Sequence, residues 1–350
     1  MNPPETALRR SAELEHLIAA DPASFRILTG DRPTGPLHLG HYFGTLASRV
    51  RLQRADVELF VLIADYQVLT DRDVTQNLTG HVTGLIADYL AAGIDPATAT
   101  IFAHSAVPAL NQLILPFLSL VSVAELTRNP TVKEEAAAAG RPSVSGLMLT
   151  YPVHQAADIA FCKANLVPVG QDQLPHLELT RAITRRFNDR YAGGGTVFPV
   201  PEALLSAAPS LLGTDGQKMS KSRGNAIDLS ATPDETARLI RQAKTDSARE
   251  ISYAPESRPE VSSLVLLAAL CQGREPEQVA AEIGSGGAAA LKRVVTESVN
   301  EFLRPLRARR AELIADPGYL RGVLRAGNAR AVAIADQTLA EVRDAMGTRY

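Results

Sequence analysis

Two histidines three residues apart, His38 and His41, have the type and spacing to bind phosphate. We expect a helix to begin at Leu37, so that both imidazoles lie on one face of its first turn. The free backbone N–H groups and the dipole of a helix N-terminus favour an anion there. Gly40 leaves room for a flat ring against the backbone. These features predict a site for a nucleoside triphosphate; a helix start with two surface histidines is the alternative.

A second pair of basic residues, Lys218 and Lys221, lies far downstream in the segment 217–222, which reads QKMSKS. Gly216 and Gly224 flank the pair and predict a mobile segment. On its own, such a segment is most simply a solvated basic loop. The order of the two patterns, HxGH and then KMSKS, argues against that interpretation. In this order they resemble the two signature motifs of class I aminoacyl-tRNA synthetases.

The elements around these motifs predict a doubly wound α/β domain with a parallel sheet. Apolar runs that indicate strands alternate with periodic segments that indicate helices. Ligands of such sheets bind beyond the carboxyl ends of the strands, where His38 falls. The resemblance to class I synthetases likewise implies a Rossmann-like fold. We expect strands over 25–28, 57–63, 98–103 and 165–170, and helices over 77–92 and 176–191.

Four segments are expected along the chain. Residues 1–24 form an N-terminal helical extension, and residues 25–210 form the Rossmann-like catalytic domain with inserted helices. Residues 211–228 carry the KMSKS loop. Residues 229–350 read as an all-α region, and the resemblance implies that it binds the tRNA anticodon. Within the catalytic domain, 111–126 reads as one strongly apolar helix that serves as core or as a subunit interface.

The composition is that of an ordinary globular protein, with 350 residues of which 45% are hydrophobic and 21% charged. We find no apolar run of the roughly 18 residues that a membrane span needs, and no apolar signal-peptide core. Cys162 and Cys271 are too few for a metal cluster or a disulfide framework. We therefore expect a cytoplasmic protein that does not bind membranes. The net charge of −2 excludes a uniformly basic nucleic-acid binder, although Lys and Arg outnumber Asp and Glu in 291–350.

The stretch 146–188 carries the residues that decide the substrate. In a helix over 151–159, Tyr151, Gln155 and Asp158 lie within reach of one pocket. A carboxylate on an apolar helix needs a donor, because unpaired burial is costly. An indole N–H only donates, so a fixed carboxylate such as Asp158 is its natural complement. The alternative is that Asp158 caps a helix or pairs with an arginine.

The same stretch resembles the tryptophanyl-tRNA synthetases, through LxYPxxxAADI at 149–159 and LVPVGxDQxxHxELTR at 166–181. The resemblance implies that Asp158 accepts from the indole N–H, while Tyr151 and Gln173 hold the ammonium group. It also implies that Leu28, Gln67 and Gln155 complete the tryptophan pocket. It implies that ATP is bound by Thr29, Gly30, Arg32, Gly40, Lys133, Gly170, Asp172, Met219 and Ser220, with His38, His41, Lys218 and Lys221 as the catalytic residues at its phosphates.

Four positions depart from the common pattern of that family. Gln155 replaces a methionine, Gln67 a histidine, Arg32 a glutamine and Glu135 a second loop lysine. The ring pocket is therefore expected to be more polar than usual, and the combination resembles the divergent second type that some bacteria carry. The chain also contains no tryptophan. Such a chain can be translated while charged tRNA for tryptophan is scarce, which suggests an auxiliary, inhibitor-tolerant isoform.

The resemblance implies two successive transfers at the carboxylate of L-tryptophan. The carboxylate attacks the α-phosphorus of ATP, giving tryptophanyl-adenylate and pyrophosphate. A terminal ribose hydroxyl of tRNA(Trp) then takes the aminoacyl group, and AMP leaves. Mg2+ is expected to be held mainly by the ATP phosphates.

A homodimer is implied, with 111–126 at its interface. Arg304, Arg307 and Arg310, on one C-terminal helix, are candidates for binding tRNA, and a solvated helix face is the alternative.

Two other functions remain open. Tyrosine also offers a donor to Asp158, so a tyrosyl-tRNA synthetase is the runner-up, although the segment GQDQLPHLELTR at 170–181 argues against it. A non-aminoacylating paralogue that binds tryptophan or a partner protein is the third reading. Such paralogues usually lose HxGH or KMSKS, and both motifs are intact here.

Overall fold

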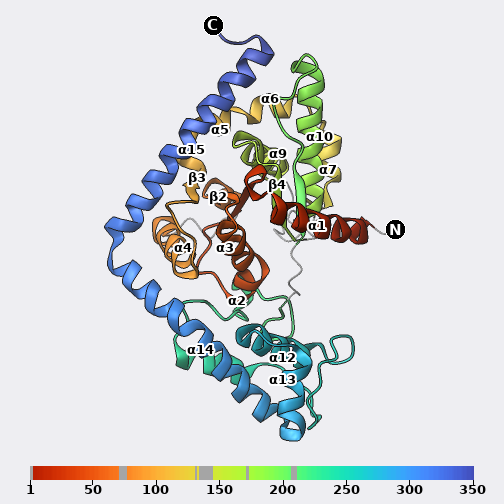
Figure 1. Ribbon diagram of the computed structural model, residues 1–350, viewed down its shortest axis with the longest axis vertical. Helices are drawn as coiled ribbons and strands as arrows, with labels where there is room; N and C mark the ends of the chain where they lie inside the picture. The colour runs from red at the N-terminus through yellow and green to blue at the C-terminus, as the bar shows by residue number, and fades with distance from the viewer. Residues whose placement is uncertain (1–2, 71–76, 131, 134–144, 171–172, 206–210) are drawn as a thin grey trace.

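The fold is built on a five-stranded sheet in which all neighbouring strands are parallel, in the order β3-β2-β1-β4-β5. Figure 1 shows this sheet enclosed by helices. The computed structural model describes residues 3–70, 77–130, 132–133, 145–170, 173–205 and 211–350. The strands are β1 (Arg26–Asp31), β2 (Glu58–Ile63), β3 (Thr100–Ala103), β4 (Leu166–Val169) and β5 (Glu202–Leu205). The predicted doubly wound α/β sheet is confirmed. Its strand order reverses between β1 and β4, where ligands bind in sheets of this kind.

Helices cover both faces of the sheet, because alternate strand residues point to opposite sides. Ile27 and Leu59 lie in one hydrophobic cluster with α3 and α4, and Leu28 and Phe60 lie in the other with α9 and α10. These helices are α3 (Ala47–Arg54), α4 (Leu78–Ala92), α9 (Gly146–Phe161) and α10 (Leu174–Tyr191). Strands buried on both faces read as continuous apolar runs, which is why such runs located most of them.

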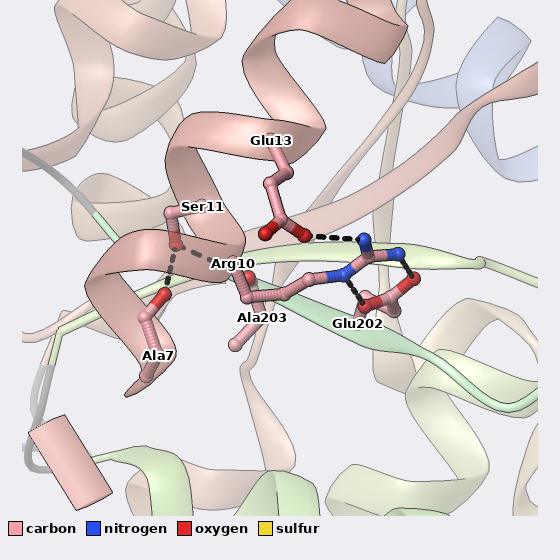
Figure 2. Close-up of polar contacts among 6 residues, drawn as sticks. All are labelled: Ala7, Arg10, Ser11, Glu13, Glu202 and Ala203. Atoms are coloured by element: carbon pink, nitrogen blue, oxygen red, sulfur yellow. Dashed lines mark hydrogen bonds and ion pairs between the residues drawn. The ribbon is translucent and has the colours of Figure 1, made fainter. Parts of the chain in front are cut away.

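The N-terminal helix α1 (Pro3–Ala20) packs on the outer strand β5, as Figure 2 shows. The Arg10 guanidinium donates to both carboxylate oxygens of Glu202, at 2.6 and 2.7 Å. Beside this pair, the Ser11 hydroxyl accepts a hydrogen bond from the Leu205 backbone N–H at 2.9 Å. Helix α1 thus covers a strand edge that would otherwise be free to pair with another chain.

The last helix, α15 (Pro317–Met346), covers the opposite edge at β3 (Figure 1). Gly327 allows a close approach, since a Cβ at this position would lie 1.8 Å from the Ile101 carbonyl oxygen. The side-chain oxygen of Asn328 accepts from the Ala103 backbone N–H at 3.0 Å. The C-terminal helices, expected as a separate region over 229–350, therefore return to the catalytic sheet.

The other C-terminal helices form the end of the molecule away from the sheet. They are α11 (Pro233–Gln242), α12 (Pro259–Gln272), α13 (Pro276–Ile283) and α14 (Gly287–Ala315). Figure 1 shows α14 and α15 as consecutive long helices along one flank, which connect this end to the sheet. Within the part of the chain that the structure describes, no helix combines the length and apolar character needed to cross a bilayer.

The predicted single helix over 111–126 is wrong. The segment forms three short helices, α5 (Pro108–Gln112), α6 (Ile114–Leu118) and α7 (Val123–Arg128). Pro116 has no N–H to donate to the Gln112 carbonyl, so a continuous helix cannot pass it undistorted. Ser122 then begins a new helix, because its hydroxyl accepts from the Glu125 backbone N–H at 3.2 Å.

Candidate active site

Two histidines meet beyond the carboxyl end of β1, where a turn leads into the short helix α2 (Leu39–His41). The helix begins at Leu39, two residues later than predicted, with His38 as its N-cap. The His38 backbone N–H donates to Nδ1 of His41 at 3.2 Å, and the two ring centroids are 3.6 Å apart. A Cβ at Gly40 would lie 3.0 Å from the His38 ring. The structure thus brings both imidazoles together at a helix start.

Both imidazoles are neutral at pH 7. Burial, with smaller contributions from His41 and Lys221, lowers the pKa of His38 to about 3. Burial also lowers the pKa of His41 to about 4, although Asp31 opposes the change. A neutral imidazole can donate a hydrogen bond to an anion, but it carries no positive charge. Charge for a phosphate must therefore come from other residues.

A buried ion pair fixes the end of β1 beside these histidines. Arg49 of α3 donates to Asp31 at 2.5 Å, and the Tyr89 hydroxyl of α4 donates to the same oxygen at 2.7 Å. Burial acts to raise the pKa of Asp31, but the Arg49 charge lowers it to about 2. Sequence reasoning missed Arg49 and Tyr89, because neither belongs to a motif.

The segment that carries the KMSKS motif packs on the turn before α2. The Leu229 backbone N–H donates to the Leu37 carbonyl at 2.8 Å. Lys221 donates from Nζ to the Gly35 carbonyl at 2.8 Å. Burial lowers the pKa of Lys221, while Asp31 opposes that change. The structure therefore brings Lys221, but not the exposed Lys218, to the histidine turn.

Asn225, three residues after the motif, organises the KMSKS segment. Its buried side chain accepts from the Ser220 backbone N–H at 2.8 Å and donates to Asp215 at 2.7 Å. Met219 is buried, and its sulfur lies 3.4 Å from the position of a Cβ on Gly40. Sequence reasoning missed Asn225, although its place close behind the motif was a usable signal.

Asp158 is buried on α9 with two histidines as neighbours. Nε2 of His104 lies 2.6 Å from one carboxylate oxygen, and Nε2 of His154 lies 3.8 Å from the same oxygen. The two imidazole rings stack, with centroids 4.3 Å apart. Among the described residues, the second oxygen of Asp158 has no hydrogen-bond partner. The predicted alternatives, a helix cap or an arginine partner, are wrong, since histidine is the partner.

The second Asp158 oxygen calls for a ligand with a hydrogen-bond donor, because an unpaired buried carboxylate oxygen is costly. The three side chains could also hold a metal ion, since their ligand atoms lie within 4.8 Å of one another. Two nitrogen or oxygen ligands of one tetrahedral zinc lie about 3.3 Å apart. The 2.6 Å contact between His104 and Asp158 is shorter, and it fits a direct hydrogen bond.

Sequence reasoning missed His104 and His154. His104 is the first residue after β3, and Gln67 and Gly170 likewise follow β2 and β4. The carboxyl ends of parallel strands meet at one edge of a sheet, so a histidine directly after the predicted strand 98–103 was a signal. For His154, the sequence offered no signal except its position one helical turn before Asp158.

The remaining predicted pocket residues lie on β1, α9 and the start of α10. The Tyr151 hydroxyl lies 2.9 Å from Nε2 of His176, which is buried in the first turn of α10. Gln173 directly precedes that helix, and Gln155 is half-buried on α9. Of the other predicted residues, Leu28, Thr29 and Gly30 lie in β1, and the first two are buried. Arg32 and Lys133 are exposed. Asp172 and Glu135 lie outside the described residues.

The C-terminal arginines differ in their surroundings. Arg304 is exposed on α14. Arg307 donates to the Thr236 hydroxyl of α11 at 2.8 Å, and Arg310 pairs with the buried Asp88 of α4 at 2.6 Å. The alternative of a solvated helix face is therefore wrong for Arg307 and Arg310, whose guanidiniums make contacts inside the molecule.

Known proteins resemble this chain over most of its length. The family model described as tRNA synthetases class I (W and Y) matches residues 21–304. The chain is 44% identical to the tryptophan–tRNA ligase of Treponema pallidum (strain Nichols), over 92% of this chain and 96% of that protein. It is 41% identical to the tryptophan–tRNA ligase of Lactococcus lactis subsp. lactis (strain IL1403), over 93% and 98%.

A solved structure agrees with these relatives. The chain resembles the tryptophanyl-tRNA synthetase of Campylobacter jejuni, solved in complex with ADP and tryptophan, with a TM-score of 0.79 and 30% identity. The similarity covers 92% of this chain and 99% of that one. The predicted fold class and enzyme class are confirmed. The chain belongs to the class I tryptophanyl-tRNA synthetases, the ATP-dependent tryptophan–tRNA ligases.

Proposed function

We propose that this ligase selects tryptophan through Asp158, which accepts a hydrogen bond from the indole N–H. The observation that carries the proposal is the second carboxylate oxygen of Asp158, buried and unpartnered within the described chain. His104 occupies the first oxygen at 2.6 Å and so orients the carboxylate. A site built around such a hydrogen bond rejects an analogue without the donor by about 10⁴–10⁵.

Tyr151 and Gln173 hold the α-ammonium group of tryptophan in this proposal. The contact of the Tyr151 hydroxyl with His176, at 2.9 Å, fixes the phenol ring. The carboxylate of tryptophan then attacks the α-phosphorus of ATP in line, and pyrophosphate leaves. Positioning of the two substrates accounts for most of the catalysis, because no covalent intermediate with the protein is needed.

The phosphates of ATP lie against the histidine turn and the KMSKS segment. Neutral His38 and His41 donate hydrogen bonds, and Lys218 and Lys221 supply the positive charge that stabilises the departing pyrophosphate. Mg2+ would travel with ATP and neutralise part of the phosphate charge. The nearby Asp31 carboxylate is engaged by an arginine and a tyrosine, which fits a Mg2+ held mainly by the phosphates.

Charging of tRNA(Trp) with labelled tryptophan, beside tryptophan-dependent ATP–pyrophosphate exchange, tests this function. Both activities are expected. Exchange without charging would point to a paralogue that stops at the adenylate, and the absence of both would point to a binding module. A tyrosine-specific enzyme would show both activities with tyrosine instead.

We also propose that the ligase is an auxiliary form that tolerates inhibitors shaped like tryptophan. Gln67 and Gln155 stand where histidine and methionine are common, and both are half-buried. Inhibition constants for indole-bearing analogues are expected to be about tenfold higher for the wild type than for the Gln67→His/Gln155→Met variant. Such a factor equals about 1.4 kcal/mol of lost contact. Equal constants would contradict the proposal.

A homodimer fits the exposed apolar side chains of the α5–α7 segment. Leu115 and Val123 are 75% and 67% exposed, whereas Leu113 and Phe117 of the same segment are buried in the core. Apolar side chains left on a surface mark candidate interfaces.

Arg304 remains a candidate for tRNA binding. A cytoplasmic location fits the unpaired state of both cysteines.

A further inference from the structure

A buried carboxylate connects a C-terminal helix with the phosphate end of the site. Asp88, on α4, is fully buried, and its two oxygens have different partners. One accepts from Nε of Arg310 on α14 at 2.6 Å, and the other accepts from the Leu37 backbone N–H at 3.0 Å. Leu37 directly precedes His38. A chain of contacts therefore runs from α14 through α4 to the histidine turn.

The backbone of Leu37 is held from both sides. Its N–H donates to Asp88, and its carbonyl accepts from the Leu229 backbone N–H at 2.8 Å. Without the Asp88 acceptor, the Leu37 N–H would be buried and unpaired, a cost that the turn can relieve only by moving. The positions of His38 and His41 therefore depend on Asp88.

Asp88 depends in turn on Arg310. Burial raises the pKa of Asp88, and the Arg310 charge is the largest influence that opposes the rise. A buried charge that loses its partner is strongly destabilised. The charge of Lys221 also lowers the pKa of Asp88. Without Arg310, Asp88 would therefore compete with the ATP phosphates for Lys221.

A second contact connects α14 with the residues after the histidines. The Phe302 ring of α14 stacks on Phe43, with centroids 5.2 Å apart, and meets the Tyr42 ring edge-on at 5.1 Å. Tyr42 and Phe43 directly follow His41. Helix α14 therefore supports the histidine segment at both ends, before His38 and after His41.

We propose that Arg310 is a positioning residue for tryptophan activation, which acts through Asp88 to hold the turn that presents His38 and His41 to ATP. The inference rests on the proposed function, because that function assigns the two histidines to the ATP phosphates. It gives a catalytic purpose to an arginine that the sequence suggested for binding tRNA.

Tryptophan-dependent ATP–pyrophosphate exchange in the absence of tRNA tests this role. The variant is Arg310→Met, and the matched control is Arg309→Met, which removes an exposed arginine paired with Glu312. Arg310→Met is expected to lower kcat/KM for ATP about tenfold or more, because small misplacements of catalytic groups are costly. The KM for tryptophan should stay within about twofold, and Arg309→Met should match the wild type, because only Arg310 acts on the turn.

Three outcomes have distinct meanings. If Arg310→Met leaves exchange unchanged and lowers only the charging of tRNA, Arg310 is a tRNA contact and the inference is overturned. A comparable loss in Arg309→Met would also overturn it. A wild-type enzyme without exchange would contradict the proposed function itself.

The double variant Asp88→Asn/Arg310→Met separates positioning from loss of stability. Asparagine keeps an oxygen for the Leu37 N–H and removes the uncompensated charge. The double variant is therefore expected to recover most of the kcat/KM for ATP that Arg310→Met loses. Thermal unfolding of each variant gives the folded fraction at the assay temperature. A loss of exchange that only follows this fraction, or a double variant no better than Arg310→Met, overturns the inference.

Discussion

His38 stays unprotonated in the folded protein, and this makes stability depend on pH. Its pKa is about 3 in the folded chain, against an ordinary value of 6.5. Between these values the unfolded state binds the extra proton, so stability falls as the pH drops from 6.5 toward 4. One such histidine contributes a slope of up to about 1.4 kcal/mol per pH unit.

His38→Gln is therefore expected to make the protein less sensitive to acid. The free energy of unfolding, measured with urea between pH 6.5 and 4.5, should fall less steeply in the variant by about 1 kcal/mol per pH unit. His16→Gln, on the exposed face of α1, is the matched substitution. Parallel slopes for wild type and His38→Gln would contradict a neutral, buried His38.

Asp158 is expected to act on tryptophan and not on ATP. Asp158→Ala should raise the KM for tryptophan by about 100-fold or more, because the indole N–H loses a buried acceptor. The KM for ATP should change by less than about threefold, since Asp158 has no contact with ATP in the proposed complex. Exchange kinetics with each substrate varied in turn measure both. An equal rise in the two constants would make Asp158 a structural residue.

Residue types singled out Asp158 as the candidate acceptor but not the histidines that contact it. The position of His104 directly after a strand could have marked it as a candidate, but its contact with Asp158 and the place of His154 became visible only in the structure. Arg310 looked like surface charge for a related reason: its partner, Asp88, is 222 residues away in sequence. Long-range pairs of this kind are determined by tertiary packing, which cannot be read from a single sequence.

At the scale of elements, apolar runs located four of the five strands. Strand β5 was missed because its sequence, EALL, contains no β-branched or aromatic residue of the kind that favours strands. The end of β1 was placed too early, at Leu28, because Thr29-Gly30 ends the apolar run. Gly30 in fact continues the strand, and a Cβ there would lie 2.4 Å from the Leu62 carbonyl oxygen. Glycine is thus required by the close approach of β1 to β2.

The KMSKS segment is expected to act during the transition state and not in tryptophan binding. Lys218→Ala and Lys221→Ala should each lower kcat for exchange by about 10²–10³-fold. Lys221→Ala should be the more severe, because Lys221 also donates to Gly35 and connects the segment with the histidine turn. Lys244→Ala is the control, since Lys244 is an exposed lysine paired with Glu260. Lost tryptophan affinity at an unchanged kcat would remove the lysines from this role.

At the scale of the whole molecule, helices from the two ends of the chain cover the two edges of one sheet. The sequence pattern set 229–350 apart from the catalytic domain, because it is wholly helical after the KMSKS motif. The structure instead returns α15 to β3. In the sequence, the only sign of this contact between α15 and β3 is a glycine within the helix, Gly327.

Gly327→Ala tests how much this return contributes to stability. Its Cβ would overlap the Ile101 carbonyl, so α15 would have to move away from the sheet, at a cost of about 1–3 kcal/mol. Gly322→Ala, in the same helix, meets no atom within 4 Å and should stabilise by up to about 1 kcal/mol. Urea unfolding measures both. Equal effects would show that α15 contributes little to the stability of the sheet edge.

The choice of amino acid tests the central claim most directly. ATP–pyrophosphate exchange by the wild-type protein is measured with tryptophan, tyrosine and phenylalanine in parallel. A site built on the Asp158 acceptor predicts a kcat/KM for tryptophan that exceeds that for phenylalanine by about 10⁴ or more, with tyrosine also far below tryptophan. Fastest exchange with tyrosine, or similar exchange with tryptophan and phenylalanine, would contradict it.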